Sequence, residues 1–295
     1  MIIVHGGAGT IDPERHATLR ASVRAAATAG HELIARGASA LDAVVAATRI
    51  LEDDPELSAG TGSALTRDGT VETDAAVMDG ATQRIGAVAA VPELGNAIAL
   101  ARAVLDANEH VLLVGPAAWA FADTVGIAPA LPGALVTERA RTRLAEHRAA
   151  RTREREGGTV GAVARDHHGN VAAATSTGGM VGKRPGRVGD SPLAGAGTWA
   201  DARVAVSATG DGEAIIRVAL AHDLALRVRA GSTLADAMRA SLAELAIVTG
   251  GSAGVIAIDA SGPLFLQLSE TMPVAWSDAA GVIHDALGEH FVPGQ

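Results

Sequence analysis

The sequence contains no cysteine among its 295 residues. This absence excludes a disulfide framework, a thiol nucleophile and any metal site built on cysteine. Serine, threonine, histidine and carboxylate side chains must therefore carry whatever chemistry the protein performs. Its ten histidines are scattered, with only His167 and His168 adjacent, so we assign them no metal site.

Long apolar runs and an excess of positive charge are also missing. No apolar run reaches the roughly 18 residues that a membrane-spanning helix needs, and the N-terminus lacks the basic region of a signal peptide. We therefore expect a cytoplasmic protein with no membrane partner. The net charge of −9 argues against a nucleic-acid partner. The arginine-rich segment 139–155 holds interspersed glutamates and no aromatic residue, which favours a solvated helix or linker.

Material for a hydrophobic core is abundant, because 48% of the residues are apolar. Strand-like and helical patterns recur in two blocks, before and after residue 158, which alone would indicate an α/β or α+β fold. Between the blocks, the polar segment up to residue 158 predicts a helix that fades into a flexible linker over about 140–158. The predicted strands are 1–4, 71–77, 85–91, 110–115, 159–165, 170–176, 203–209, 253–259 and 263–268, and the predicted helices are 14–36, 39–52, 97–108, 117–124, 213–229 and 233–246.

Two glycine-containing segments stand next to predicted strands. The turn His5-Gly6-Gly7-Ala8-Gly9 follows the first strand, but it matches neither the dinucleotide pattern nor a P-loop. The pair Gly158-Thr159 opens a later strand. Cleavage between them would give Thr159 a free α-amino group, which can act as the base for its own hydroxyl near neutral pH. By itself such a pair is more often an ordinary loop-to-strand junction.

The sequence after Thr159 strengthens the catalytic interpretation. It reads G-T-V-G-A-V-A from Gly158, G-N-V-A-A-A-T-S-T-G-G-M from Gly169, G-R-V-G-D-S-P from Gly186 and G-A-G from Gly195. This series resembles the plant-type L-asparaginase and isoaspartyl peptidase family of N-terminal nucleophile hydrolases. The motifs follow one another in the right order over a span of some forty residues.

The resemblance implies both a fold and a processing step. The expected fold is α+β, a four-layer αββα sandwich in which 1–158 form an α-subunit portion and 159–295 a β-subunit portion of one shared fold. Cleavage is expected between Gly158 and Thr159, and the two pieces are expected to stay together through their shared core. The family also implies a homodimer of cleaved αβ units and no cofactor for catalysis.

Three further residues receive catalytic roles from the resemblance. Thr177 matches the threonine that hydrogen-bonds to the nucleophile, although without the motif an ordinary strand residue with a satisfied hydroxyl would be favoured. The stretch Ser207-Ala208-Thr209-Gly210-Asp211-Gly212-Glu213 resembles the family pattern S-x-T-G-x-G-E. In that pattern the threonine hydroxyl and the following glycine N–H form the oxyanion hole, here Thr209 and Gly210. A helix start without a catalytic role would look the same.

Arg187 and Asp190 suit a substrate with an aspartyl head, which carries an α-carboxylate and an α-ammonium. A guanidinium binds a carboxylate through two parallel hydrogen bonds, while Asp190 can accept from the ammonium. From their spacing alone the two side chains could instead pair with each other. The match to every position of G-R-V-G-D-S-P favours substrate binding.

A carboxylate-rich segment, 51–62, resembles the family's sodium-binding loop, L-E-x-x-P-x-F-N-A-G-x-G. Leu57 and Ser58 replace the usual phenylalanine and asparagine, and that asparagine lies near the nucleophile in relatives. From the residues alone a surface loop with solvated acids would be favoured, because the spacing matches no EF-hand. The resemblance implies a structural sodium ion held by the backbone carbonyls of Leu51, Glu52, Asp54, Leu57, Ala59 and Thr61.

The predicted function is self-cleavage followed by hydrolysis of L-asparagine and β-aspartyl (isoaspartyl) dipeptides through an acyl-enzyme. One alternative within the same fold is a glycosylasparaginase-like amidase. Another is an uncleaved, inactive scaffold or small-ligand binder. Ser58, the short linker and Ala253, which replaces a glycine of the family loop G-G-x-G-G at 250–254, support that second alternative.

Overall fold

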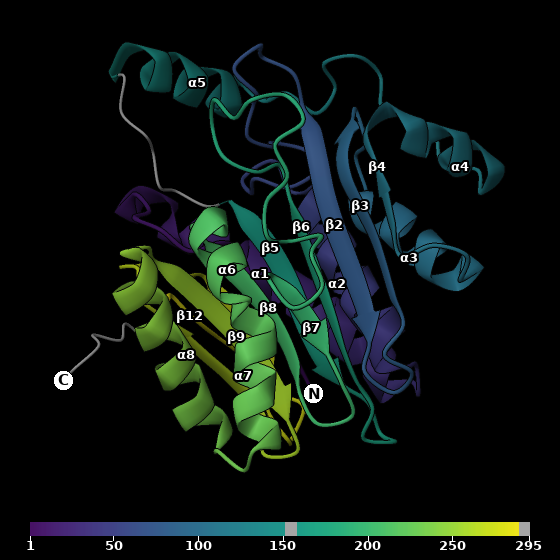
Figure 1. Ribbon diagram of the computed structural model, residues 1–295, viewed down its shortest axis with the longest axis vertical. Helices are drawn as coiled ribbons and strands as arrows, with labels where there is room; N and C mark the ends of the chain where they lie inside the picture. Colours follow the sequence, from purple (N-terminus) through teal and green to yellow (C-terminus); the bar gives the residue numbers. More distant parts are fainter. Residues whose placement is uncertain (151–157, 289–295) are drawn as a thin grey trace.

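The computed structural model describes residues 1–150 and 158–288, and its strands form two sheets. All neighbouring strands pair antiparallel except β3 and β4, which are parallel. The larger sheet has the order β12 (Ile283–Ala286), β11 (Val274–Ser277), β1 (Ile2–His5), β5 (Thr159–Arg165), β6 (Val171–Thr177), β2 (Glu72–Asp79), β3 (Ile85–Pro92) and β4 (Leu112–Val114). The smaller sheet has the order β10 (Gly262–Gln267), β9 (Ala253–Asp259), β8 (Ala205–Gly210) and β7 (Thr198–Ala200) (Figure 1).

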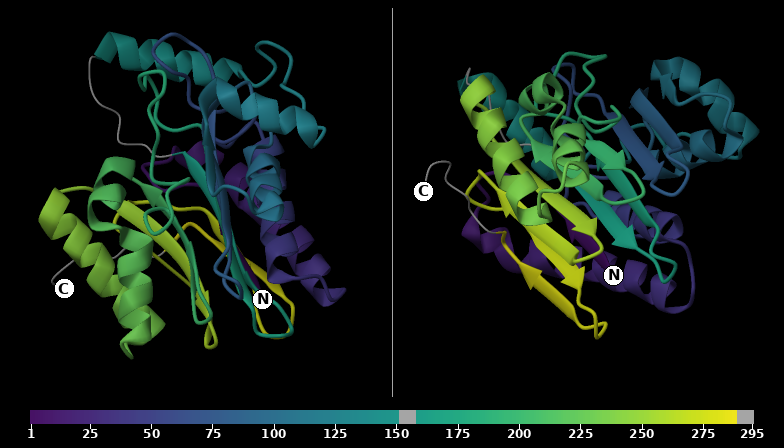
Figure 2. Two further views of the ribbon diagram at one scale, coloured as in Figure 1. Left: turned by 45° about the vertical axis from the view of Figure 1, so that its right-hand side comes forward. Right: turned by 60° about the horizontal axis from the view of Figure 1, so that its bottom comes forward.

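Helices cover the outer face of each sheet, as the two views in Figure 2 show. Helices α1 (His16–Ala35), α2 (Ala40–Asp53) and α3 (Ala97–Ala107) pack on the larger sheet. Helices α6 (Gly212–Val218), α7 (Leu220–Arg229) and α8 (Leu234–Thr249) pack on the smaller one. The sheets face each other, with β5 and β6 of the larger against β8 of the smaller. The predicted four-layer αββα sandwich is therefore confirmed.

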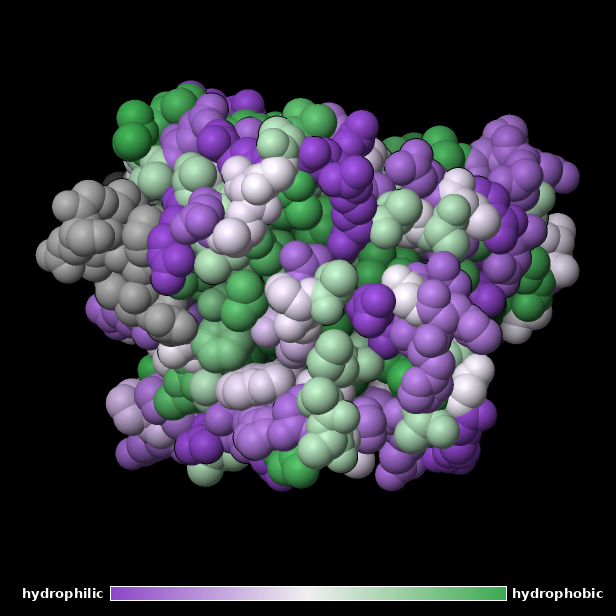
Figure 3. All heavy atoms as spheres, turned by 90° about the horizontal axis from the view of Figure 1, so that it is seen from below, coloured by the Kyte–Doolittle hydropathy of each residue, from purple (hydrophilic) through white to green (hydrophobic). Residues whose placement is uncertain are grey.

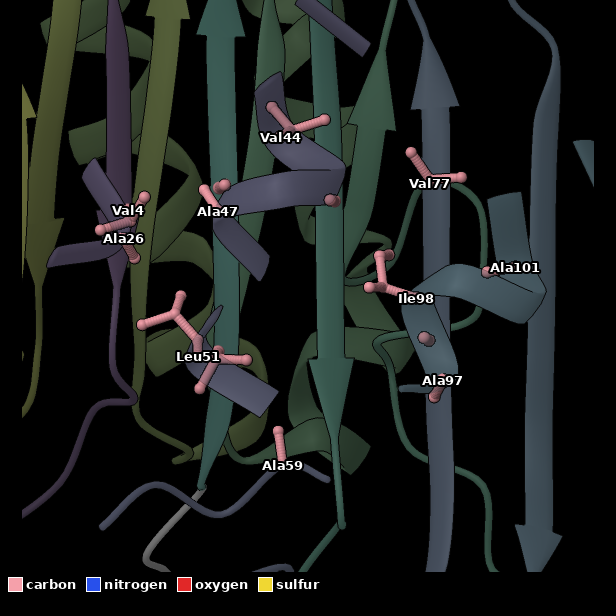
Figure 4. Close-up of a cluster of buried hydrophobic side chains, with 14 of the residues drawn as sticks. Val4, Ala26, Val44, Ala47, Leu51, Ala59, Val77, Ala97, Ile98 and Ala101 are labelled. Atoms are coloured by element: carbon pink, nitrogen blue, oxygen red, sulfur yellow. The ribbon is translucent and has the colours of Figure 1, made fainter. Parts of the chain in front are cut away.

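Three apolar clusters fill the spaces between these four layers. Valine, leucine and alanine side chains of α1, α2 and α3 meet the outer face of the larger sheet in the cluster of Figure 4. A second cluster joins α6–α8 to the smaller sheet. The third lies between the sheets, where Ile3 and Val163 belong to the same cluster as Ile256 and Ile258. Strands buried on both faces explain why β5 and β6 read as continuous apolar and small residues rather than as alternating ones.

Polar residues are interspersed with apolar ones over most of the face drawn in Figure 3. Of the helices in the described ranges, none combines the length and the apolarity that crossing a bilayer requires.

The structure differs from the sequence-based expectation in the second half of the chain. The predicted helix 213–229 is two helices, broken at Ala219, whose φ of 49° and ψ of 51° are left-handed. The break lets the N–H groups of Ala221 and His222 donate to the carbonyls of Ala196 and Gly195. Strands β7, β11 and β12, of three or four residues each, were not predicted.

The segment before Gly158 also differs in part. Residues 140–150, which we expected to begin a flexible linker, belong to α5 (Glu138–Ala150). Ala140 and Leu144 of this helix pack against Leu65 and Val181, which explains why it ends later than its polar sequence indicated. The remainder of the predicted linker, 151–157, lies outside the described residues. Shorter elements complete this half: α4 (Ala118–Thr124) and two 3-10 turns, Pro13–Arg15 and Gly115–Ala117.

A fully buried carboxyl group, Glu52, joins three elements at the end of α2. Its Oε1 accepts from the Ile98 N–H at 3.0 Å and from the Ser176 hydroxyl at 2.5 Å. Helix α3 has no side-chain cap of its own at Asn96, so Glu52 supplies that hydrogen bond from outside the helix. Burial raises the pKa of Glu52 to about 8, and the bond from Ser176 opposes the shift.

We expect Glu52 to make stability fall as the pH rises. The folded state keeps its proton up to a pKa of about 8, whereas the unfolded state loses it near 4.5. Above 4.5 the folded state therefore binds more protons than the unfolded one, and the free energy of unfolding decreases until about pH 8. Glu52→Gln, which imitates the neutral acid, should be less sensitive to pH across this window.

The measurement is urea unfolding between pH 4.5 and pH 8.5. Both proteins should carry Thr159→Ala, so that the predicted cleavage does not divide the chain. Asp53→Asn, at the exposed neighbouring carboxylate, is the matched control. Equal pH dependence in wild type and Glu52→Gln would contradict the prediction.

Candidate active site

Thr159 is the first residue of β5, and it pairs with Thr177 at the end of β6. The Thr159 hydroxyl donates to Thr177 Oγ1 at 3.2 Å, and both side chains are buried. Thr177 Oγ1 also accepts from the Gly179 N–H at 2.9 Å, which fixes its position. The antiparallel register thus brings together two threonines that are 18 positions apart in the sequence.

Gly158 precedes Thr159 in a confined space. A Cβ atom added at Gly158 would lie 2.0 Å from the Cβ of Ser58, so a larger residue would force one of the two segments to move. A hydrogen bond fixes the backbone of Ser58, because its carbonyl accepts from the Gly178 N–H at 2.8 Å. The glycine turn Gly6–Gly9, Ser58 and Gly158 line one small cavity here, together with Arg139 and Arg143.

Thr209 and Gly210 end β8, in the sheet that packs over β5. Thr209 Oγ1 accepts from the Ala8 N–H at 3.2 Å, which leaves the hydroxyl proton available as a donor. Gly210 has a φ of 135°, and a Cβ there would lie 2.5 Å from the Ser252 carbonyl. A side chain at 210 would be disfavoured both by this φ and by the contact with the Ser252 carbonyl, which explains why glycine stands there.

Arg187 forms a bidentate ion pair with Glu213, in the first turn of α6. Arg187 Nε donates to Oε1 at 3.1 Å and Nη2 donates to Oε2 at 2.8 Å. The sequence reasoning assigned Glu213 no role, although Glu213 closes the S-x-T-G-x-G-E pattern. The pair fixes the plane of the guanidinium group through one edge. Its remaining group, Nη1, lies near Gly189 and Gly179.

Asp190 is buried beside this arginine without a hydrogen bond to it. A Cβ at Gly212 would lie 2.8 Å from Asp190 Oδ1 and 2.9 Å from Arg187 Nη2, so both side chains border the same glycine. The alternative in which Arg187 and Asp190 pair with each other is not what the structure has. Asp190 Oδ2 is buried and has no hydrogen-bond partner among the residues that the structure describes.

The environment of Asp190 favours a cationic ligand. Burial raises the pKa of Asp190 to about 7, while its own backbone N–H and the charge of Arg187 oppose the shift. A buried carboxylate oxygen without a donor is costly. An ammonium group placed against Oδ2 would supply both the donor and the opposite charge. The arrangement can therefore hold a carboxylate and an ammonium next to each other.

Lys183 is a further charged residue that the sequence reasoning missed. It is buried, and its Nζ donates to the Glu72 carbonyl at 2.8 Å. Burial lowers its pKa, which the charges of Asp74 and Glu72 counteract. Asp74, also fully buried, accepts from the Gly189 N–H at 3.1 Å and so supports the loop between Arg187 and Asp190. A lysine seven residues before a motif aspartate gave no signal in the sequence.

The segment 51–62 brings several backbone carbonyls close together. A Cβ at Gly60 would lie 2.4 Å from the Glu52 carbonyl, and one at Gly62 would lie 2.6 Å from the Leu57 carbonyl. Some predicted sodium ligands already accept hydrogen bonds: Glu52 O from Thr61 N at 2.8 Å, and Leu57 O from Arg139 Nη2 at 3.1 Å. A carbonyl oxygen has two lone pairs, so the loop still fits a hard cation. Among the described residues, no group of three or more histidines and carboxylates could hold a metal.

Comparison with known proteins finds relatives that match nearly the whole chain. A family model described as asparaginase matches residues 1–284. The isoaspartyl peptidase/L-asparaginase of Bos taurus is 42% identical over 297 residues, which cover 97% of this chain and 96% of that protein. The isoaspartyl peptidases of Salmonella typhimurium and Escherichia coli are 45% and 42% identical, and each alignment covers 95% of this chain. These alignments cover 95% and 93% of the respective relatives.

Proposed function

The chain belongs to the asparaginase family, and on that basis we propose that it is a self-cleaving threonine amidohydrolase acting on L-asparagine and β-aspartyl dipeptides. The observation that carries the proposal is the Thr159 hydroxyl, hydrogen-bonded to Thr177 on the strand that starts directly after Gly158. The names of the relatives support the substrate class, and they favour the peptidase over a glycosylasparaginase-like amidase.

Self-cleavage follows from the position of this hydroxyl. Thr159 Oγ attacks the carbonyl carbon of Gly158, the C–N bond breaks, and the Thr159 nitrogen takes up a proton as an N-to-O acyl shift forms an ester. Water then hydrolyses the ester. The products are a Gly158 carboxylate and a Thr159 residue with a free α-amino group, which is the base that the hydroxyl needs.

Substrate hydrolysis uses the same hydroxyl. The Thr159 amine takes its proton while Oγ attacks the side-chain carbonyl carbon of the substrate, and the proton then passes to the departing ammonia or amine. Thr209 Oγ and the Gly210 N–H stabilise the negative oxygen of the tetrahedral intermediate. Water hydrolyses the resulting aspartyl ester and regenerates Thr159. Each step uses groups of the protein and water, so catalysis needs no cofactor.

Arg187 and Asp190 select the aspartyl head in this proposal. Glu213 holds the arginine through Nε and Nη2, and the guanidinium group receives the α-carboxylate of the substrate. Asp190 Oδ2 receives the α-ammonium. α-Linked aspartyl dipeptides should fail, because their carboxylate would occupy the place of the scissile carbonyl.

A structural sodium ion on the carbonyls of Leu51, Glu52, Asp54, Leu57, Ala59 and Thr61 is part of the proposal. The close approach of carbonyls around Gly60 and Gly62 supports it. The homodimer of cleaved αβ units and the cytoplasmic location stay predictions.

The first expected result is cleavage between Gly158 and Thr159, which gives pieces of 158 and 137 residues. Intact-mass spectrometry of aged protein checks it, and Thr159→Ala should stay uncut. Gly158→Ala should slow cleavage, because its Cβ would meet Ser58. Ser58→Gly in the same chain should restore part of the rate. An undivided wild-type chain after prolonged incubation would favour the inactive scaffold instead.

The second expected result concerns the α-amine of the substrate. N-acetylation of a β-aspartyl dipeptide removes a charge-assisted hydrogen bond to Asp190, worth about 1.5–3 kcal/mol, or roughly ten- to a hundredfold in kcat/KM. The assay belongs at pH 8, above the Asp190 pKa of about 7. Arg187→Lys should also lose activity, because an ammonium cannot form the bidentate contact. Equal rates on both substrates would leave Asp190 without a binding role.

The third expected result is a thermal midpoint that is higher in sodium chloride than in the chloride of a large organic cation at equal ionic strength. Coordination of the carbonyls in 51–61 stabilises the folded state by mass action. Asp53→Asn should keep this difference, since the proposed ligands are backbone oxygens. A midpoint indifferent to the cation would argue against the ion.

A further inference from the structure

A line of four buried polar side chains crosses the space between the two sheets. His5, Ser207, Thr175 and Thr198 are each 0% exposed, and they come from β1, β8, β6 and β7. His5 Nε2 lies 3.0 Å from Ser207 Oγ, Ser207 Oγ lies 2.8 Å from Thr175 Oγ1, and Thr175 Oγ1 lies 2.7 Å from Thr198 Oγ1. Thr198 Oγ1 in turn lies 2.9 Å from the Ser191 carbonyl.

The two ends of this line have defined donors and acceptors. The Gly7 N–H donates to His5 Nδ1 at 3.4 Å, so the imidazole carries its proton on Nε2. Burial lowers the pKa of His5 to about 3, which keeps the ring neutral. At the other end the Ser191 carbonyl can only accept. Thr198 has one hydroxyl proton, which it donates either to Thr175 Oγ1 or to the Ser191 carbonyl, and Thr175 Oγ1 can donate to the Gly197 carbonyl at 3.3 Å. In either pattern the line ends on carbonyls of the same loop.

The line passes directly against the strand of the nucleophile. A Cβ at Gly161, two residues after Thr159, would lie 2.1 Å from Ser207 Oγ and 2.6 Å from His5 Nε2. The far end reaches the loop that begins at Asp190. That loop closes on itself, because the Asp190 carbonyl accepts from the Leu193 and Gly197 N–H groups at 3.0 Å each. The line contacts this loop at the carbonyl of Ser191, the residue after Asp190.

We propose that the hydrogen-bonded line His5–Ser207–Thr175–Thr198 positions the Asp190 loop relative to β5, which makes Thr198 and Ser207 positioning residues for substrate binding. The inference rests on the proposed function, since its enzymatic readout is recognition of the aspartyl α-ammonium by Asp190. Its structural readout, the protection of the loop 190–197, is independent of activity.

The enzymatic test compares Thr198→Val, which keeps the shape and removes the hydroxyl, with Thr198→Ser, which keeps the hydroxyl. We expect Thr198→Val to raise the KM for a β-aspartyl dipeptide about fivefold, equivalent to about 1 kcal/mol, and to change kcat less than twofold. Thr198→Ser should resemble wild type. Thr73→Val is the matched control, because the Thr73 hydroxyl is also buried and bonded, to the Leu94 carbonyl at 3.1 Å, outside the line.

The structural test uses hydrogen exchange by mass spectrometry on the uncut Thr159→Ala chain. Thr198→Val should accelerate exchange in 190–197 relative to Thr73→Val. If Thr198→Val does not fold, Ser207→Ala breaks the same line at another link. An unchanged KM and unchanged exchange in Thr198→Val, or equal losses in Thr198→Ser or Thr73→Val, would overturn the proposal. Inactive wild type with accelerated exchange in Thr198→Val would instead overturn the proposed function alone.

Discussion

The antiparallel pairing of β5 with β6 is the constraint on which the rest of the site depends. It sets Thr159 opposite Thr177, and a shift of one residue would turn both side chains to other neighbours. The register is strongly specified because both strands are buried on both faces, so a shift would also displace every apolar contact of the two layers. The nucleophile is thus positioned by the core of the protein rather than by a loop.

Two buried carboxyl groups of this core accept hydrogen bonds from other elements. Glu52 joins α2 to α3 and β6, and Asp74 joins β2 to the loop before Asp190. Buried hydrogen bonds of this kind are costly to break, because the remaining partner stays unsatisfied. Asp190 Oδ2 is one of several buried side-chain atoms that have no hydrogen-bond partner in the described structure, and Glu52 Oε2 is another. A ligand with an ammonium group would supply a partner for Asp190 Oδ2.

The sequence predicted the fold and the family, because local motifs and periodicity carry both, while the roles of the site residues stay predictions. Glu213 as the partner of Arg187 was not predictable in this way. The two residues are 26 positions apart, and their contact depends on how α6 meets the loop around Gly189. The break at Ala219 was missed because alanine favours a continuous helix, whereas the loop carbonyls at 195–196 favour the left-handed turn. Tertiary contacts decided both.

The order of strands in the larger sheet has a consequence for the separability of the two pieces. A cut before Thr159 would assign β1, β2, β3 and β4 to one polypeptide and β5, β6, β11 and β12 to the other. Across the sheet, β1 then lies between β11 and β5, so the two polypeptides are interleaved. Neither could leave without breaking ladders on both sides of β1 as well as that between β6 and β2. Dissociation would therefore proceed at the rate of global unfolding, and reassembly from separated pieces would be a second-order reaction.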